Sequence, residues 1–205
     1  MKSVPAQSKH SKLILFLLII IILGPIIFAW MLYHKGNHQQ LRLSNEGDLI
    51  SSPPNISSSN FFDLSKKESF TGAILKGKWW LVYVGPDKCY QECENTLYNL
   101  RQVRLALGKN TERVDRLFIP HPDCAVNVCE QFLNEFYPDM RRAKMDQVEF
   151  NHLFKPISNP IDREMVGEIY IVDPHGNVMM HYSAESEANA ILSDLKRLLK
   201  VSKIG

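Results

Sequence analysis

Residues 79–93 of this 205-residue chain read WWLVYVGPDKCYQEC, and the rest of the sequence is organised around them. The first part is an apolar run rich in aromatic and β-branched residues, which is typical of a buried strand. Gly85 and Pro86 end that strand. Two cysteines, Cys89 and Cys93, follow directly after the turn and are four positions apart.

The segment from about Tyr90 to Ala106 carries leucines and valines at helical spacing, which predicts a helix with Asp87 as its cap. Both thiols then lie on its first turns, on one face and roughly 6 Å apart. The positive end of a helix favours the thiolate, which is both the nucleophile and the metal ligand. We expect Cys89 to be the more exposed and reactive, and Cys93 to resolve a mixed disulfide or complete a metal clamp. A structural disulfide, or two unrelated core cysteines, is the alternative.

Residues 13–33 form an apolar segment of about 20 residues, enough to cross ~30 Å of hydrocarbon. It is longer than the core of a signal peptide and is followed by no small-residue cleavage site, so we expect an uncleaved anchor. Lys2, Lys9 and Lys12 precede it and only Lys35 follows closely. The positive-inside rule then holds the N-terminus in the cytoplasm and sends the rest outside.

These observations divide the chain into four parts. We expect a cytoplasmic N-terminus at 1–12, a transmembrane anchor at 13–33, a flexible tether at 34–60 and one folded domain at 61–205. The tether is polar and rich in serine, proline and asparagine, with little to bury. The net charge of +2 gives no reason to expect binding to nucleic acid.

The remaining pattern alternates between strands and helices. Strands are expected at 114–119, 168–172 and 178–182, the last two joined by a turn at 173–177. Helices are expected at about 130–140 and 185–200. A β-α-β unit, a hairpin and a final helix, with a dithiol at the start of the first helix, form the thioredoxin architecture. The predicted fold class is therefore α/β and thioredoxin-like, preceded by one N-terminal transmembrane helix.

Several motifs together resemble one family. They are the run from Gly77 to Gly85, Cys89-x-x-x-Cys93, and Tyr170-Ile171-Val172-Asp173-Pro174-x-Gly176. They are similar to the Sco/SenC group, membrane-anchored thioredoxin-like proteins that help to build the copper site of cytochrome c oxidase. A bacterial set of single-span proteins, often encoded among cytochrome oxidase and haem A assembly genes, is more similar still. It shares motifs such as Leu97-Tyr98-x-x-Arg101-Gln102 and the tail at 194–200.

The resemblance implies copper(I) as a cofactor, with one departure. Sco proteins bind copper through both thiolates and a histidine before the strand that here contains Tyr170. The matching position in this chain is Met165, and residues 154–167 contain no histidine. A thioether is a soft ligand suited to Cu(I), so Met165 is a candidate third ligand beside Cys89 and Cys93, and a packing residue otherwise.

Two further cysteines, Cys124 and Cys129, would lie outside the membrane, where disulfides form. They are a candidate disulfide, two free thiols, or a redox relay to the first pair. Together with His121 they match no standard zinc spacing. The other histidines of the domain, His152, His175 and His181, and the basic runs 141–144 and 196–200 are expected to be solvated, the basic runs on helix faces.

The sequence therefore supports three hypotheses. The first is a membrane-anchored accessory factor for assembly of the cytochrome c oxidase copper site, a thiol-disulfide oxidoreductase acting through Cys89 and Cys93. The second is a Cu(I) chaperone that uses the same thiolates. The third is a non-catalytic assembly scaffold. The expected partners are cytochrome c oxidase subunits or other oxidase assembly factors. The expected location is the bacterial inner membrane, with the domain in the periplasm.

Overall fold

The structure, a computed structural model, describes residues 14, 17–27, 30, 45–86, 89–122, 127–154, 167–183 and 185–204, with the side chains of 127–130 left aside. The chain divides into two compact units, residues 1–44 and 45–205. Each is considered by itself.

The described part of the first unit is helical at residues 17–27. Its apolar side chains are largely exposed, for example Ile21 at 68% and Ile22 at 62%. The sequence predicts a transmembrane helix over 13–33. Over the described residues, no helix combines the length and the apolarity needed to span a membrane.

The second unit is built on a mixed sheet. Its described strands follow the order β1-β8-β7-β4-β5-β6-β2-β3. Their bounds are β1 Asp48–Leu49, β2 Asn60–Asp63, β3 Glu68–Thr71, β4 Trp79–Gly85, β5 Val114–Pro120, β6 Arg141–Lys144, β7 Glu168–Val172 and β8 Val178–Tyr182. β4 pairs in parallel with β5 and antiparallel with β7. The apolar run at 79–85 therefore forms a strand in the middle of the sheet.

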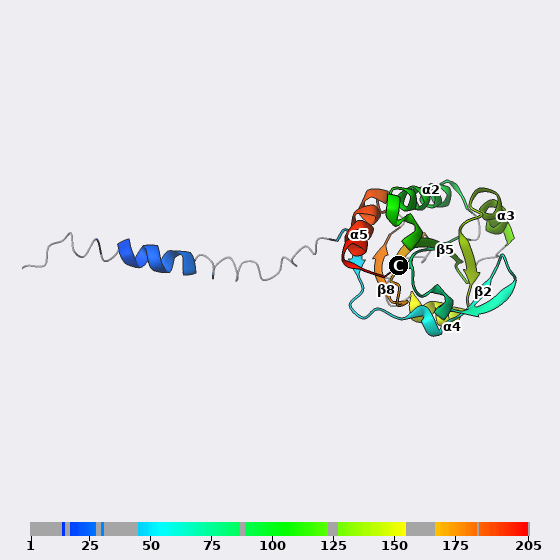
Figure 1. Cartoon of the computed structure of the whole chain (residues 1–205), viewed down its shortest axis with the longest axis horizontal. Coiled ribbons are helices and arrows are strands. Elements are labelled where there is room, and N and C mark those ends of the chain that lie inside the picture. The colour runs from blue at the N-terminus through cyan, green and yellow to red at the C-terminus, as the bar shows by residue number, and fades with distance from the viewer. Residues whose placement is uncertain are drawn as a thin grey trace, which may run out of the picture. The chain divides into compact units, whose positions relative to one another are not determined.

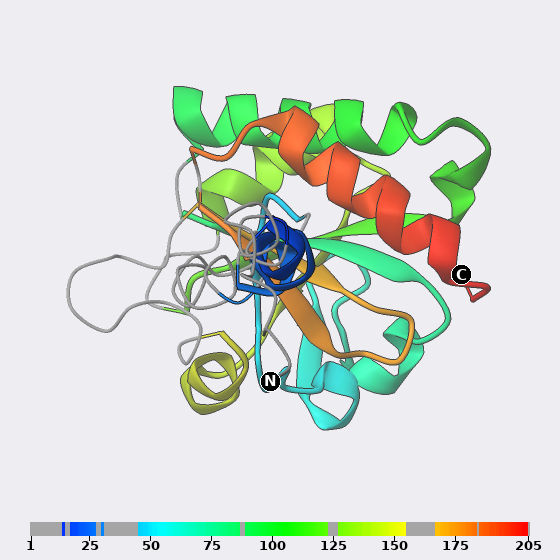
Figure 2. The ribbon, with the colours of Figure 1, turned by 90° about the vertical axis from the view of Figure 1, so that its left-hand side faces the viewer.

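Helices cover both faces of this sheet (Figure 1). They are α2 Gln91–Leu105, α3 Asn127–Phe136, α4 Gln147–Leu153 and α5 Ala188–Val201, with the short 3-10 helices η1 Ile56–Ser58, η2 Gly72–Leu75 and η3 Gly108–Arg113. Figure 1 shows α2, α3 and α5 on one side and α4 on the other. Figure 2 shows α2 (green) and α5 (red) packed next to each other, in agreement with their contacts.

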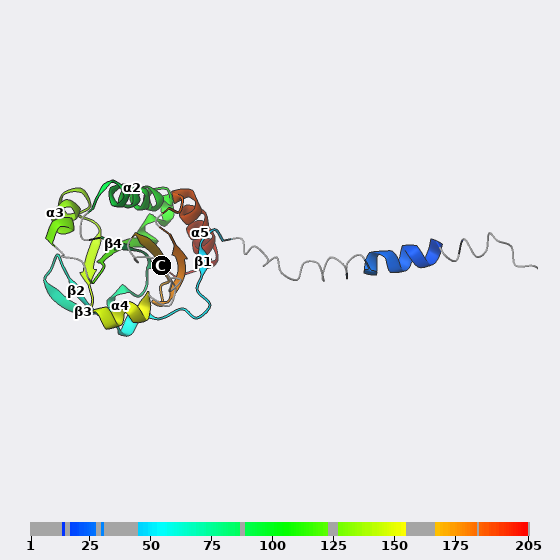
Figure 3. The same cartoon turned by 180° about the vertical axis from the view of Figure 1, so that it is seen from behind.

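The core follows from the alternation of side chains along β4. Leu81 and Tyr83 point into the cluster under α2, α3 and α5, whereas Trp80, Val82 and Val84 point into the cluster under α4, η1 and η2. Since successive side chains of a strand point to opposite faces, an unbroken apolar run is what a strand covered on both faces requires. Figure 3 shows β4 between the two helical layers.

Most predicted elements are confirmed. The strands at 168–172 and 178–182 have the predicted bounds. β4 includes Gly85, at which the strand is predicted to end, and β5 extends the predicted strand by one residue to Pro120. The helices α2 and α5 differ from the prediction by a few residues at their ends. The thioredoxin-like α/β arrangement of the folded unit is therefore as expected.

The folded domain begins earlier in the structure than the sequence predicts. The compact unit begins at Asn45, so residues that the sequence assigns to the tether belong to it. Ile56 is 1% exposed and packs in the core, and the backbone N–H of Glu46 and of Gly47 donate to the carboxylate of Asp194. Serine and proline content suggests a tether, but contacts with residues far along the chain order this segment.

The structure also differs from the prediction at the basic run 141–144. It forms strand β6, beside β5 and β2, and is not a solvated helix face. Arg142 is buried, and its guanidinium donates to Ser65 and Asn134. A buried arginine with polar partners is indistinguishable in sequence from an exposed one, because the fold decides which polar groups, such as Ser65, lie beside it. In the run at 196–200, Lys196, Arg197 and Lys200 are exposed on α5, as expected, whereas Leu199 is buried in the core.

Candidate functional site

Three connecting segments meet at one edge of the sheet. β4 and β5 are parallel and end there, and β7 is antiparallel and begins there. The backbone N–H of His121, after β5, donates to the carbonyl of Gly85 at 3.0 Å. The N–H of Gly167, before β7, donates to the carbonyl of Val84 at 2.7 Å. The segment that carries the two cysteines leaves β4 between these two neighbours.

Gly85 sets the path of that segment. A Cβ at this position would lie closer than 3.0 Å to two carbons of the Phe118 ring. Phe118 is 1% exposed on the adjacent strand and has little room to move. Only glycine allows the last residue of β4 to pass this ring, so the turn after β4 depends on its missing side chain.

Cys89 and Cys93 are joined by a disulfide at this edge, with their Cα atoms 5.1 Å apart. Cys93 is 4% exposed and belongs to the core cluster beneath α2, whereas Cys89 is half-buried. The pair therefore has one sulfur turned toward the interior and one nearer to solvent. This matches the expected difference in exposure between the two thiols.

The helix begins later than predicted. Its N-cap is Tyr90, without a capping side-chain hydrogen bond, so Cys89 precedes the helix and only Cys93 lies in its first turn. The predicted cap, Asp87, lies outside the described residues. Glu92 and Glu94 also occupy the first turn, and their carboxylates complement the positive helix end.

The other predicted site residues are only partly described. Met165 and Cys124 lie outside the described residues, and for Cys129 only the backbone, within α3, is described. Their ligand role and their disulfide remain predictions. Among the described residues, no three side chains of histidine, cysteine, aspartate or glutamate are grouped so that they could hold a metal ion. The two sulfurs of Cys89 and Cys93 are soft donors, and reduction of their disulfide would free both for Cu(I).

The histidines differ in their surroundings. His152 and His175 are exposed, as expected, but His181 is not solvated. Its side chain is 11% exposed, its ring packs on Tyr170, and its Nε2 pairs with the carboxylate of Glu168, which is 6% exposed. Glu168 was not considered in the sequence. The signal was present, since it is an acidic residue at the start of an otherwise apolar strand.

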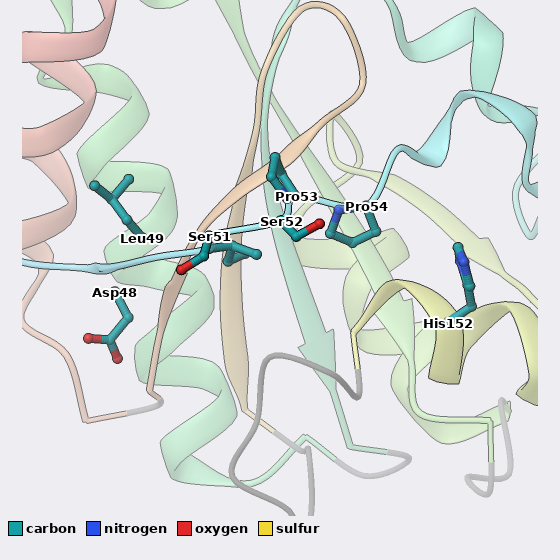
Figure 4. Close-up of a pocket in the computed structure, with 8 residues that line it drawn as sticks. Asp48, Leu49, Ser51, Ser52, Pro53, Pro54 and His152 are labelled. Carbon is teal, nitrogen blue, oxygen red and sulfur yellow. The ribbon is translucent and has the colours of Figure 1, made fainter.

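The described residues of the folded unit also line two surface grooves. One is bounded by residues 48–54 and by His152 of α4, with a volume of about 570 Å³ (Figure 4). No cysteine is among its described lining residues, and we assign it no role. The other, of about 560 Å³, lies between α2 and α3. The sequence pattern does not predict this second groove, although Tyr98 is an aromatic residue on the polar face of α2.

Comparison with known proteins identifies relatives of this fold. Residues 79–202 match the family model described as "Transmembrane-like, thioredoxin-like, C-terminal domain". None of the curated proteins matches the chain. Among solved structures, yeast Sco1 with copper bound is 19% identical, with a TM-score of 0.57, covering 74% of this chain and 96% of that one.

Two bacterial structures give the same result. Apo Sco1 from Thermus thermophilus is 16% identical, with a TM-score of 0.57, over 77% of this chain and 99% of that one. ScoI from Bradyrhizobium japonicum with copper bound is 21% identical, with a TM-score of 0.50, over 74% and 98%. At these identities the likeness concerns the fold.

Proposed function

Because this chain belongs to the transmembrane-like, thioredoxin-like C-terminal domain family, we propose that it is a membrane-anchored thiol-disulfide exchange protein acting through Cys89 and Cys93. The observation that carries the proposal is the disulfide at the sheet edge, with a half-buried Cys89 and a buried Cys93. An inert structural bridge has no need of an accessible sulfur, whereas exchange requires one.

The reaction follows from this asymmetry. In the reduced protein, the Cys89 thiolate attacks one sulfur of a partner disulfide, forms a mixed disulfide and releases the other partner sulfur as a thiolate. The Cys93 thiolate then attacks the sulfur of Cys89. This closes the Cys89–Cys93 disulfide and releases the second partner sulfur. Two electrons pass to the partner, and the bond formed is the one present in the structure.

The proposed biological setting follows from the resemblance of the sequence motifs to the Sco/SenC group. We place the reaction in the assembly of the copper site of cytochrome c oxidase, with oxidase subunits or other assembly factors as partners. The apolar segment at 13–33 would anchor the chain in the bacterial inner membrane, with the domain in the periplasm. Disulfides form and persist in that compartment, which suits a dithiol that cycles between two states.

Trapping of the mixed disulfide tests the proposal. Cys93→Ser removes the resolving thiol, so this variant should accumulate covalent complexes with partner proteins through Cys89. Cys89→Ser should trap nothing, since the remaining sulfur is buried. Both variants should abolish oxidase assembly. Assembly that survives in both variants would leave only the scaffold hypothesis, and trapping by Cys89→Ser alone would reverse the two roles.

Copper transfer is the second candidate, favoured by the copper-bound Sco structures that share this fold. The reduced Cys89 and Cys93 thiolates would hold Cu(I) as cargo, with Met165 as the candidate third ligand. Cu(I) affinity should be measured in competition with a chelator for the reduced full chain, for Cys89→Ser and for Met165→Ala. Cysteine-dependent, tight binding of one equivalent supports transfer; its absence excludes this candidate and leaves exchange.

A further inference from the structure

The groove between α2 and α3 lies next to the disulfide and is lined by aromatic rings. The described lining consists of Gln91, Glu94, Asn95 and Tyr98 from α2, Phe132 and Phe136 from α3, and Tyr137. Gln91 and Glu94 share the first turn of α2 with Cys93. The groove therefore starts beside the proposed reaction site and extends along the helix away from it.

The rings in this groove are unusually open to solvent. Tyr98 is 57% exposed and Phe136 is 52% exposed, although an apolar ring gains from burial. Phe132 packs between Phe136 and Tyr137, with ring centroids 5.0 and 5.9 Å away. Phe136 is the exposed member of this cluster of three rings, and Tyr98 lines the same groove from α2. Exposed aromatic rings that line one groove are typical of sites at which another molecule binds.

The charges give the groove a direction. Glu94 is the charged residue among its described lining residues, and Glu92 lies in the same first turn. Both are at the end near Cys93. Arg101, three residues after Tyr98 on α2 and therefore farther from Cys93, is exposed. A bound chain is therefore expected to carry a positive charge near the disulfide and an apolar ring farther along.

We propose that this groove binds the polypeptide segment next to the reacting cysteine of the partner protein, with a lysine or arginine facing Glu94 and an aromatic side chain against Tyr98 and Phe136. This inference rests on the proposed exchange reaction and describes the partner segments that the reaction would select. The partner cysteine bonds to Cys89, just before α2, and Tyr98 follows Gln91, the first residue of α2, by seven residues, about 10.5 Å along a helix. An extended chain covers that length in about three residues, which sets the distance between the partner's cysteine and its ring.

A thiol-free peptide tests the groove without requiring any exchange. The probe is Phe-Gly-Lys-Ser-Lys-Gly-Phe, whose symmetry makes chain direction irrelevant, and the control is Ser-Gly-Asp-Ser-Asp-Gly-Ser. Binding is measured by fluorescence anisotropy to the full chain in lipid nanodiscs, with empty nanodiscs subtracted. We expect the probe to bind about tenfold more tightly than the control, as burial of one aromatic side chain implies.

Variants locate the binding. Phe136→Ser, Tyr98→Ser and Glu94→Lys should each lower the affinity for the probe toward that of the control peptide. Val148→Ser, at a 78% exposed position of α4, and Glu112→Lys, in η3, are matched controls and should leave it unchanged. Two aromatic variants are included so that one that fails to fold does not decide the result.

The outcomes separate this inference from the proposed function. Equal affinity for both peptides, or an equal loss in the control variants, overturns the groove as a binding site. Exchange is measured separately as the reduction of glutathione disulfide by the reduced wild-type protein. Failure of that reaction in the wild type would overturn the exchange reaction while leaving the peptide result to judge the groove.

Discussion

Gly85 shows how a single missing side chain controls the approach to the disulfide. The ring of Phe118 fills the space that a Cβ at Gly85 would need. The cysteine segment starts one residue later, at Pro86. The last described residue of that segment before the cysteines, Pro86, therefore follows directly from the position of Gly85.

We predict that Gly85→Ala destabilises the folded unit by about 1–3 kcal/mol, the usual effect of overpacking a tight core. The free energy of unfolding, from urea titration, measures it. Phe118→Leu removes the two ring carbons in question, so the double variant should lose less than the sum of the two single changes. Strict additivity in that cycle would contradict the proposed contact.

Two further side chains of the core carry polar groups. Arg142 donates to Ser65 and Asn134, and His181 pairs with Glu168 across the β7–β8 hairpin. Burial of such groups is tolerated because their hydrogen bonds replace those to water. The sequence around each residue does not identify its hydrogen-bond partner. The sequence pattern therefore predicts that both side chains are solvated.

At the scale of elements, the segment from Asn45 to Ser59 is attached to the sheet and to α5 rather than free. The carboxylate of Asp194, 1% exposed, accepts from the backbone N–H of Glu46 and Gly47 and from the hydroxyl of Tyr182. Farther along, Gly72 lies against the carbonyl of Ile56, where a Cβ would have no room. These contacts order a stretch whose composition alone predicts a tether.

Tyr182 makes this attachment sensitive to alkaline pH. Burial, together with the neighbouring Asp194 carboxylate, raises the pKa of Tyr182 well above its ordinary value of 10.0. The folded state therefore holds the phenol proton where the unfolded state releases it. The stability from this group is present below about pH 10 and is lost as pH rises further toward the folded pKa.

We predict that the wild-type free energy of unfolding falls between pH 9 and pH 11. Tyr182→Phe should be less stable at neutral pH, through loss of its hydrogen bond, yet fall less steeply in that range. The measurement is the urea midpoint at each pH. Tyr90→Phe, at a 69% exposed position, is the control and should follow the wild type. Parallel curves for wild type and Tyr182→Phe would contradict the assigned pKa direction.

At the scale of the whole molecule, the chain combines a thioredoxin-like unit with a separate N-terminal unit. An exchange protein attached to a membrane meets partners confined to the same surface, which raises its effective concentration for them. We therefore propose that the apolar segment 13–33 retains the domain near membrane partners.

We predict that the full chain stays with the membrane after carbonate extraction, and that deletion of residues 13–33 releases it. The reason is that about 20 apolar residues are enough to span the hydrocarbon core. An unrelated single-span helix placed at the same position should restore retention and is the control. Extraction of the full chain by carbonate would contradict the anchor.

The central parts of this protein follow from local sequence. The run at 79–85 is apolar without interruption, which only a strand covered on both faces requires, and its ending at Gly85 places a cysteine pair at the sheet edge. The hairpin at 168–182 is equally local, since two largely apolar runs joined by an Asp-Pro-x-Gly turn define it. Period and turn chemistry act between near neighbours, so they can be read from the sequence.

Only the tertiary structure decided where the folded unit begins, which ring constrains the turn before the cysteines, and that two helices leave a line of rings beside the disulfide. Each depends on residues far apart in the chain: Asp194 with Glu46, Phe118 with Gly85, and Tyr98 with Phe136. Burial and contact arise from the packing of the whole chain, and no spacing within one segment encodes them.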